Sequence, residues 1–318
     1  MEDVPACARS WDCVSGHVDS ENNINRRIIK FRKCIKDYKV IGWGSCSDVI
    51  VSGEIGDEYV IKRVVKSILN SKRIGYYFNE IRCLEKISCS SIIIMKSVFQ
   101  TEITYNLVLE RGVNDLYHFS EGLEYSDDRL DKVVKDLCKA IEYIHNIGVY
   151  HRDIKPENVI VFIDNRLNHT FKLCDFGLAV MDSDIGRGSV GSPGFYSPEM
   201  SSYVEYSRKY ADYWGLGCLI LEGIIGNNRF ISEWLCDCYK QTSGLELANK
   251  CNDVLESYYK KTNKKWLYTK SLLNLIPDNR SLPHLVRRRT SSLDRIIDFM
   301  ERKKILSQKY DKICPIED

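Results

Sequence analysis

Residues 1–25 are polar and lack periodicity, and the hydrophobic runs that follow them in the first third of the chain predict strands. β-branched residues flank a glycine-bearing turn within residues 41–49, and a second turn is predicted at residues 53–56. Runs of this kind, bounded by glycines, are typical of β-hairpins. Two further strands are predicted over residues 91–99 and 104–110.

A different pattern, with apolar side chains at helical spacing, predicts helices. It occurs in residues 66–87 and again in residues 127–147, where Gly148 is expected to end the helix. Residues 218–300 are also helical in pattern. The chain is therefore expected to begin with strands and one helix and to continue mainly with helices.

Composition narrows the class of protein without identifying it. The 318 residues suggest roughly two domains, and a net charge of +2 gives no reason to expect direct nucleic-acid binding. The 13 cysteines include no CxxC pair, which indicates reduced thiols. Residues 1–20 lack the apolar core of a signal peptide, and no apolar run reaches the ~18 residues that span a membrane. We expect an intracellular protein, in the cytoplasm or the nucleus, without a membrane segment.

The strongest chemical signal is the string HRDIKPEN at residues 151–158, which is followed by DFG at residues 175–177. Asp153, Asn158 and Asp175 offer oxygen atoms. Magnesium prefers oxygen ligands, and a further carboxylate is needed to orient a hydroxyl and accept its proton. The set therefore indicates a site that holds magnesium and a nucleotide phosphate beside a hydroxyl that is to be phosphorylated.

A glycine-bearing loop and a lysine precede this signal in a characteristic order. The loop IGWGSCSDV occupies residues 41–49, and Lys62 follows in a strand-like run. Glycines let the backbone approach phosphates closely and lend its N–H groups. Loop, strand, lysine, HRD and DFG in this order resemble the eukaryotic-type protein kinases. The resemblance covers about residues 38 to 300 and is specific because the motifs keep compatible spacings.

The resemblance implies an α+β, bilobal fold. Residues 38–110 would form a small N-terminal lobe with a β-sheet and one main helix, and residues 113–300 a larger, mostly helical C-terminal lobe. Residues 1–37 are expected to be a flexible extension and residues 301–318 a charged tail. The compact chain, rich in isoleucine, asparagine, tyrosine and cysteine, raises a viral origin as one interpretation, in which case the compartment is that of a host cell.

The resemblance also assigns catalytic roles. Asp153 would be the general base, while Lys155 and Lys62 would contact the nucleotide phosphates. Asn158 and Asp175 would bind magnesium. The implied cofactors are therefore ATP and Mg²⁺.

Further residues are implied in binding the nucleotide. Glu80 is the predicted partner of Lys62, with Glu85 as the alternative. The other positions are Ile41, Gly42, Gly44, Ser45, Val49, Val60, Leu109, Glu110 and Ile160. Two of the motif positions depart from the family, since Ser47 replaces a third glycine and Val60 replaces an alanine.

The expected activity is that of a serine/threonine kinase. Lys155, together with Ser192 in the segment 191–193, resembles serine/threonine kinases more than tyrosine kinases. A monomer would transfer the γ-phosphate of ATP to serine or threonine of a protein substrate. The departures at Ser47 and Val60 leave open the alternative of a pseudokinase that binds nucleotide or partners without catalysis.

Residues that would hold the site in place are predicted as well. Glu199 is expected to pair with Arg280, and Asp212 to hold backbone N–H groups near Arg152. His151 is expected to be structural rather than catalytic.

The sequence leaves open whether phosphorylation regulates the site. Arg152 would bind a phosphorylated Ser189 or Ser183, unless the short loop orders itself. The basic stretch 26–39 is interpreted as a solvated segment before the first strand, with a docking or nuclear-targeting patch as the alternative. Residues 287–289 are interpreted as solvent-exposed, with binding of an acidic substrate or a partner as the alternative.

Overall fold

The computed structural model describes residues 30–32, 34–43, 47–68, 70–202, 205–235, 244–259 and 265–283. Several positions named above lie outside these ranges: Gly44, Ser45, residues 1–29, 287–289 and 301–318. The chain divides into two compact units, each described by itself. Unit 1 is Met1–Val113 with Cys174–Gly177, and unit 2 is Asn114–Leu173 with Leu178–Asp318.

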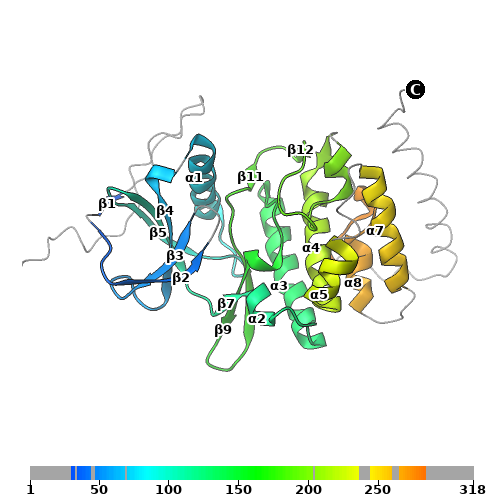
Figure 1. The fold of residues 1–318 in the computed structure, drawn as a ribbon, viewed down its shortest axis with the longest axis horizontal. Coiled ribbons are helices and arrows are strands. Elements are labelled where there is room, and N and C mark those ends of the chain that lie inside the picture. Colours follow the sequence, from blue (N-terminus) through cyan, green and yellow to red (C-terminus); the bar gives the residue numbers. More distant parts are fainter. Residues whose placement is uncertain are drawn as a thin grey trace, which may run out of the picture. The chain divides into compact units, whose positions relative to one another are not determined.

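Unit 1 contains a six-stranded sheet in the spatial order β1-β5-β6-β4-β3-β2 (Figure 1). The strands are β1 Lys30–Phe31, β2 Tyr38–Trp43, β3 Asp48–Ser52, β4 Tyr59–Val65, β5 Met95–Gln100 and β6 Thr104–Glu110. All neighbours are antiparallel except β1, which runs parallel to β5. Strand β5 begins later than predicted because the chain turns before it, where the Ile92 N–H donates to the carbonyl oxygen of Cys89 at 3.1 Å.

Strand β1 corrects the expectation that the whole of residues 1–37 is a flexible extension. Lys30 and Phe31 pair with Phe99 and Gln100 of β5. Arg32 then donates its backbone N–H to the Gln100 carbonyl at 2.7 Å and forms an ion pair with Glu54. The segment is ordered because its backbone extends the sheet, a contact that the sequence pattern of a two-residue strand does not reveal.

Helix α1, Ser71–Lys86, packs on the sheet of unit 1 (Figure 1). It starts five residues later than residue 66, where the pattern had placed its beginning, because Asn70 caps it by accepting the Arg73 N–H at 2.9 Å. Its buried face includes Ile81 and Leu84. The Tyr77 ring stacks on Tyr105 of β6 with 5.6 Å between centroids. Burial of this face fixes which helical side chains point toward the sheet.

Unit 2 is mainly helical, as predicted. Its helices are α2 Leu116–Ser120, α3 Asp127–Asn146, α4 Arg208–Ile225, α5 Asn227–Arg229, α7 Gly244–Tyr259 and α8 Lys265–Leu272, with a π-helix at Phe230–Leu235. Helix α3 follows its predicted bounds closely. It starts at the capping residue Ser126, and Gly148, at φ +70°, allows the chain to turn after it.

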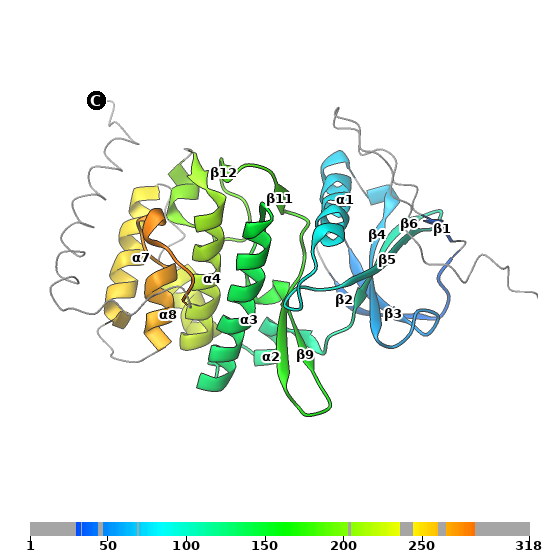
Figure 2. The same ribbon diagram turned by 180° about the vertical axis from the view of Figure 1, so that it is seen from behind.

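Helix α4 forms the centre of unit 2 and lies beside α3 in both views (Figures 1 and 2). Every residue from Ala211 to Ile225 is buried, so the helix, which is mostly apolar, is enclosed on all sides. Its packing is close: a Cβ on Gly223 would lie 2.4 Å from the Tyr125 ring. Despite this apolar helix, none in the described part of the chain is both long and apolar enough to cross a membrane.

The remaining strands of unit 2 position its loops. Strands β7 Asn114–Asp115, β9 Val159–Ile163 and β10 His169–Leu173 form one small sheet. Strand β8 Val149–Tyr150 pairs with β11 Val180–Met181, and β12 Ile185–Gly186 pairs with β13 Tyr206–Ser207. Short 3-10 helices cover Pro156–Asn158, Pro198–Ser202 and Pro277–Asn279. The predicted α+β architecture, with strands first and helices after, is confirmed.

Candidate active site

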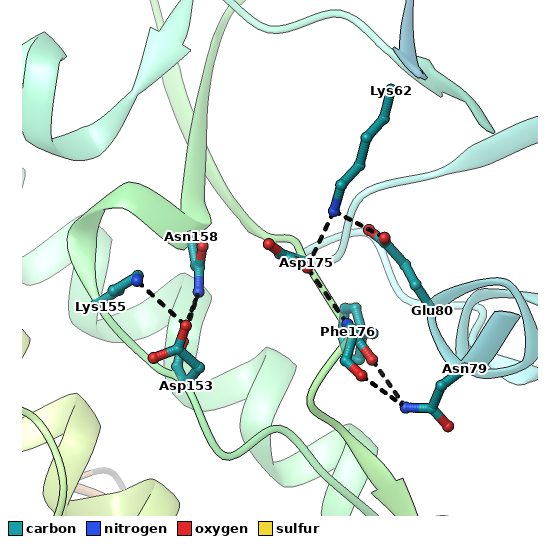
Figure 3. A network of polar contacts seen from close by, with 9 residues as sticks. Lys62, Asn79, Glu80, Asp153, Lys155, Asn158, Asp175 and Phe176 are labelled. Atoms are coloured by element: carbon teal, nitrogen blue, oxygen red, sulfur yellow. Dashed lines mark hydrogen bonds and ion pairs between the residues drawn. The ribbon is translucent and has the colours of Figure 1, made fainter. Parts of the chain in front are cut away.

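Three charged side chains of unit 1 meet beside strand β4, and we call them the phosphate set: Lys62, Glu80 and Asp175 (Figure 3). The Lys62 Nζ lies 2.8 Å from Glu80 Oε2 and 3.1 Å from Asp175 Oδ1. Lys62 lies on β4, Glu80 on α1, and Asp175 in the segment 174–177, which belongs to unit 1 although it is far along the chain. The predicted pair of Lys62 with Glu80 is present, whereas the alternative partner Glu85 is exposed on the other face of α1.

Burial and charge act against each other in the phosphate set. Burial alone would lower the pKa of Lys62, but the negative charges of Asp175 and Glu80 outweigh it and raise the pKa above the usual value. Burial raises the pKa of Glu80, and the charge of Lys62 only partly opposes this. Lys62 therefore remains a cation at any physiological pH, as the binding of a phosphate requires.

The strand register of unit 1 places the predicted nucleotide-binding residues on adjacent strands. Gly42 of β2 lies opposite Val49 of β3, and Val49 lies opposite Lys62. Val60 lies opposite Leu109 of β6. Val60 and Lys62 share strand β4, which lies between β3 and β6 in the sheet.

The other predicted nucleotide contacts have different surroundings. Ile41 is 46% exposed and Leu109 only 7% exposed. Glu110 ties the end of β6 to the residue before β5, since its Oε1 accepts the Ile94 N–H at 2.8 Å. Ile160 belongs to β9 of unit 2 and is half-buried.

Four residues of unit 2 form a second constellation, the acceptor set: Asp153, Lys155, Asn158 and Ser192. Ser192 Oγ donates to Asp153 Oδ1 at 2.9 Å, and Asn158 Nδ2 donates to Asp153 Oδ2 at 3.0 Å. Lys155 Nζ donates to Ser192 Oγ at 2.7 Å and lies 3.3 Å from Asp153 Oδ2. Figure 3 shows Lys155 and Asn158 converging on Asp153. Both carboxylate oxygens are thus held, which fixes the direction of the group.

Local backbone features bring the side chains of the acceptor set together. A turn of 3-10 helix at Pro156–Asn158 brings Asn158 back to Asp153, whose carbonyl oxygen also accepts the Asn158 amide at 2.8 Å. Gly191 has φ +103°, and a Cβ there would lie 2.5 Å from the Arg152 carbonyl oxygen. Only glycine permits this close approach, which places Ser192 on Asp153. The sequence had singled out Ser192 for substrate class but not for this contact.

Asp212 of α4 anchors the start of the catalytic segment, as predicted. Its carboxylate accepts the backbone N–H groups of His151 at 2.8 Å and Arg152 at 2.7 Å. A further contact, 2.8 Å to Nε2 of His145, was not foreseen. His151 is fully buried, in agreement with a structural role. Arg152 adopts φ +67°, a strained conformation that these bonds help to hold.

The predicted brace between Glu199 and Arg280 is also present. Arg280 donates to Glu199 Oε1 at 2.5 Å and to Oε2 at 2.9 Å, and both residues are buried. Burial tends to raise the pKa of Glu199, but the guanidinium outweighs it and lowers the pKa below its ordinary value. Arg280 also lies over the ring of Trp214, 4.8 Å from its centroid. The pair thereby joins the segment after the acceptor set to the central helix.

The segment between Asp175 and Glu199 is held by polar contacts of its own. Asp184 accepts the Ser207 hydroxyl at 2.6 Å and the Lys209 N–H at 2.7 Å, both at the start of α4. Ser189 is exposed, and its hydroxyl donates to the Met200 carbonyl at 3.0 Å. Arg152 Nε donates to the Leu178 carbonyl at 2.6 Å. The part that a phosphorylated serine would play therefore stays a prediction.

Each unit, taken by itself, offers one oxygen donor of the kind that magnesium prefers. Asn158 uses its NH₂ group on Asp153, so the oxygen of the same amide points away from that carboxylate (Figure 3). The Asp175 side chain is 45% exposed. An amide oxygen and a carboxylate are hard ligands of the kind that magnesium prefers, with phosphate oxygens and water completing its shell.

Comparison with known proteins agrees with this geometry. The family model described as protein kinase domain matches residues 35–288. A human SNF-related serine/threonine-protein kinase is 27% identical over 71% of this chain and 31% of its own length. A probable myosin light chain kinase of Dictyostelium discoideum is 34% identical over 67% and 44%, and bovine serine/threonine-protein kinase 33 is 30% identical over 61% and 42%.

These matches define the class: the chain belongs to the protein kinase family. Its similar relatives are serine/threonine kinases. The matched regions span less than half the length of these relatives.

Proposed function

We propose that this protein is an ATP- and magnesium-dependent serine/threonine protein kinase. The single observation that carries the proposal is the acceptor set, in which Asp153 is held by Ser192 and Asn158 with Lys155 beside it. A carboxylate fixed in direction and flanked by a cation suits the work of orienting a substrate hydroxyl and accepting its proton. Members of the family use an aspartate at this motif position in that role.

Each member of the two sets then has a role in the transfer. Asp153 orients the hydroxyl of a substrate serine or threonine and takes its proton. Lys155 neutralises charge that builds up on the transferring phosphoryl group. Lys62 binds nucleotide phosphates, and Glu80 keeps Lys62 in position. Phosphoryl transfer has a loose transition state, so positioning and charge account for most of the catalysis.

Magnesium and ATP complete the proposed site. As the family resemblance implies, Asn158 and Asp175 would hold the metal ion, which would neutralise negative charge on the phosphates. The apolar positions Val49, Val60 and Leu109 would contact the base of the nucleotide. The partner that the proposal requires is a protein with an accessible serine or threonine.

The proposal is tested by supplying γ-labelled ATP and magnesium with a mixed protein substrate and identifying the labelled amino acid. Label on serine or threonine supports the proposal. Label on tyrosine overturns the assignment of substrate class that rests on Lys155 and Ser192. Magnesium-dependent ATP binding without any transfer instead supports the pseudokinase, which the departures at Ser47 and Val60 favour.

A further inference from the structure

Asn79 contacts the segment that carries the proposed metal ligand, and neither the motif pattern nor the proposed mechanism uses it. Its Nδ2 donates to the carbonyl oxygens of Phe176 and Gly177, each at 3.2 Å (Figure 3). Asn79 lies on α1 directly before Glu80. Helix α1 therefore holds the tripeptide 175–177 in two ways. Asn79 binds the backbone of the tripeptide directly, and Glu80 pairs with Lys62, which in turn pairs with the Asp175 side chain.

The tripeptide 175–177 needs such support because its conformation is unfavourable by itself. Asp175 has φ +60°, in the left-handed region that residues other than glycine rarely adopt. Conformations of this kind persist when their surroundings determine them, and they are concentrated at functional sites. Phe176 is fully buried, which holds the middle of the tripeptide but leaves its backbone carbonyls to be satisfied.

The packing around Gly177 shows how close this segment lies to α1. A Cβ at Gly177 would lie 3.6 Å from the Tyr76 carbonyl oxygen and 3.3 Å from Asp175 Oδ1. Tyr76 and Asn79 are three residues apart and therefore share one face of the helix. The Gly177 N–H also donates to Asp175 Oδ1 at 3.3 Å. A small shift of this backbone therefore moves the carboxylate of Asp175.

We infer that Asn79 is a positioning residue for the metal–nucleotide site: its amide fixes the backbone of Phe176 and Gly177 so that the Asp175 carboxylate is directed toward the metal ion and Lys62. The inference rests on the proposed function, since it gives Asp175 a magnesium ion to bind. A carboxamide suits this position because it donates without adding charge beside Lys62, Glu80 and Asp175. A side chain without a donor would leave two carbonyl oxygens without this partner.

The test measures ATP binding by the full chain with and without Mg²⁺, for the wild type, Asn79→Leu and the control Arg82→Leu. Leucine resembles asparagine in size but cannot donate, and Arg82 is exposed on the same helix. For Asn79→Leu we expect about a tenfold weaker affinity in Mg²⁺, the effect of roughly one lost hydrogen bond. The affinity without Mg²⁺ should stay within twofold, and Arg82→Leu should match the wild type in both conditions.

The outcomes separate this inference from the proposed function. Equal losses with and without Mg²⁺ would indicate a general structural role for Asn79 and overturn the inference. Unchanged binding by Asn79→Leu would also overturn it. If the wild type itself shows no magnesium-linked ATP binding, the proposed function is overturned, and with it the magnesium role of Asp175. A second variant, Asn79→Ser, keeps one donor and should lie between the wild type and Asn79→Leu.

Discussion

The phosphate set of unit 1 and the acceptor set of unit 2 are held together in different ways. Lys62 and Asp175 are 113 residues apart in the chain, and the phosphate set is joined by contacts between full charges. Asp153 and Asn158 are five residues apart, and Ser192 adds a neutral hydroxyl. The phosphate set thus depends on the placement of helix α1 and one loop, whereas most of the acceptor set depends on a local turn.

The helices that hold the two sets also differ in how deeply they are buried. The acceptor set is tied to Asp212 on α4, the most deeply buried helix described in unit 2. The phosphate set is tied to α1, which buries only one face. We therefore expect the acceptor set to be the more rigid of the two and the phosphate set to be the one that ligands can adjust.

Removing the anchor of the acceptor set should have the largest effect. Asp212→Asn replaces the charged acceptor of two backbone N–H groups, and hydrogen bonds to charged groups are worth about 1.5–3 kcal/mol each. We expect phosphate transfer to fall by at least about 100-fold and the melting temperature to drop, as measured by labelled transfer and calorimetry. The exposed Asp253→Asn on α7 is the matched control. Wild-type transfer by Asp212→Asn would refute the anchoring role.

Breaking the phosphate set should have a smaller and more selective effect. Glu80→Gln removes one charge beside Lys62 but leaves Asp175 in contact. We expect kcat/KM for ATP to fall about 10- to 100-fold, the value of one charge-assisted hydrogen bond. Steady-state kinetics with Glu85→Gln as the control on the same helix checks this. A loss in Glu85→Gln instead would reassign the partner of Lys62.

The central helix contains a buried carboxyl that should make stability depend on pH. Glu222 is 6% exposed, and burial raises its pKa to about 7, although its contact with Asn227 opposes the shift. Because the folded-state pKa exceeds the unfolded value, this group stabilises the fold below about pH 4.5, and that contribution is lost as the pH rises through about 7.

Glu222→Gln should remove this dependence while it keeps an acceptor for Asn227. We expect the variant to be more stable than the wild type at pH 8 by about 1 to 3 kcal/mol, with the difference vanishing near pH 4. Urea unfolding at the two pH values measures it. The exposed Glu256→Gln on α7 should show no such pattern. A destabilised Glu222→Gln at pH 8 would mean that the charged form is favoured in the fold.

The smallest effect is expected for Ser183 and Ser189, in the segment of chain that follows Asp175. Ser183 and Ser189 are exposed, and the segment between them is already held by Asp184 at the start of α4. We expect the double variant Ser183→Ala, Ser189→Ala to transfer phosphate within about twofold of the wild type, because a surface hydroxyl is worth at most about 0.5 kcal/mol. A loss above tenfold would show that one of the serines is modified for activity.

The comparison also explains what the sequence alone could predict. Asp153, Lys155 and Asn158 of the acceptor set were predictable because they lie in one short string whose spacing determines its geometry. The contact of Ser192, 39 residues further along the chain, was not predicted. The pair of Lys62 with Glu80 was predictable from the helical pattern, since Ile81 and Leu84 had to face the core. The brace between Glu199 and Arg280 followed from the family resemblance.

Other features depend on tertiary contacts that no local pattern reveals. Strand β1 pairs with β5 through backbone groups, which carry no residue signature. Asn79 was missed because its partners are the carbonyl oxygens of a distant segment. The predicted start of α1 was wrong because the spacing of apolar positions does not show where a helix is capped, and the polar residue Asn70 caps this one.

The role of Asp153 on the acceptor hydroxyl is tested most directly by comparing Asp153→Asn with the wild type for transfer and for ATP binding in the same buffer. Asparagine keeps the shape of the side chain but cannot accept a proton. We expect transfer to serine or threonine to fall by about 10²- to 10⁴-fold while the stabilisation by Mg²⁺–ATP stays the same. Undiminished transfer by Asp153→Asn would contradict this role.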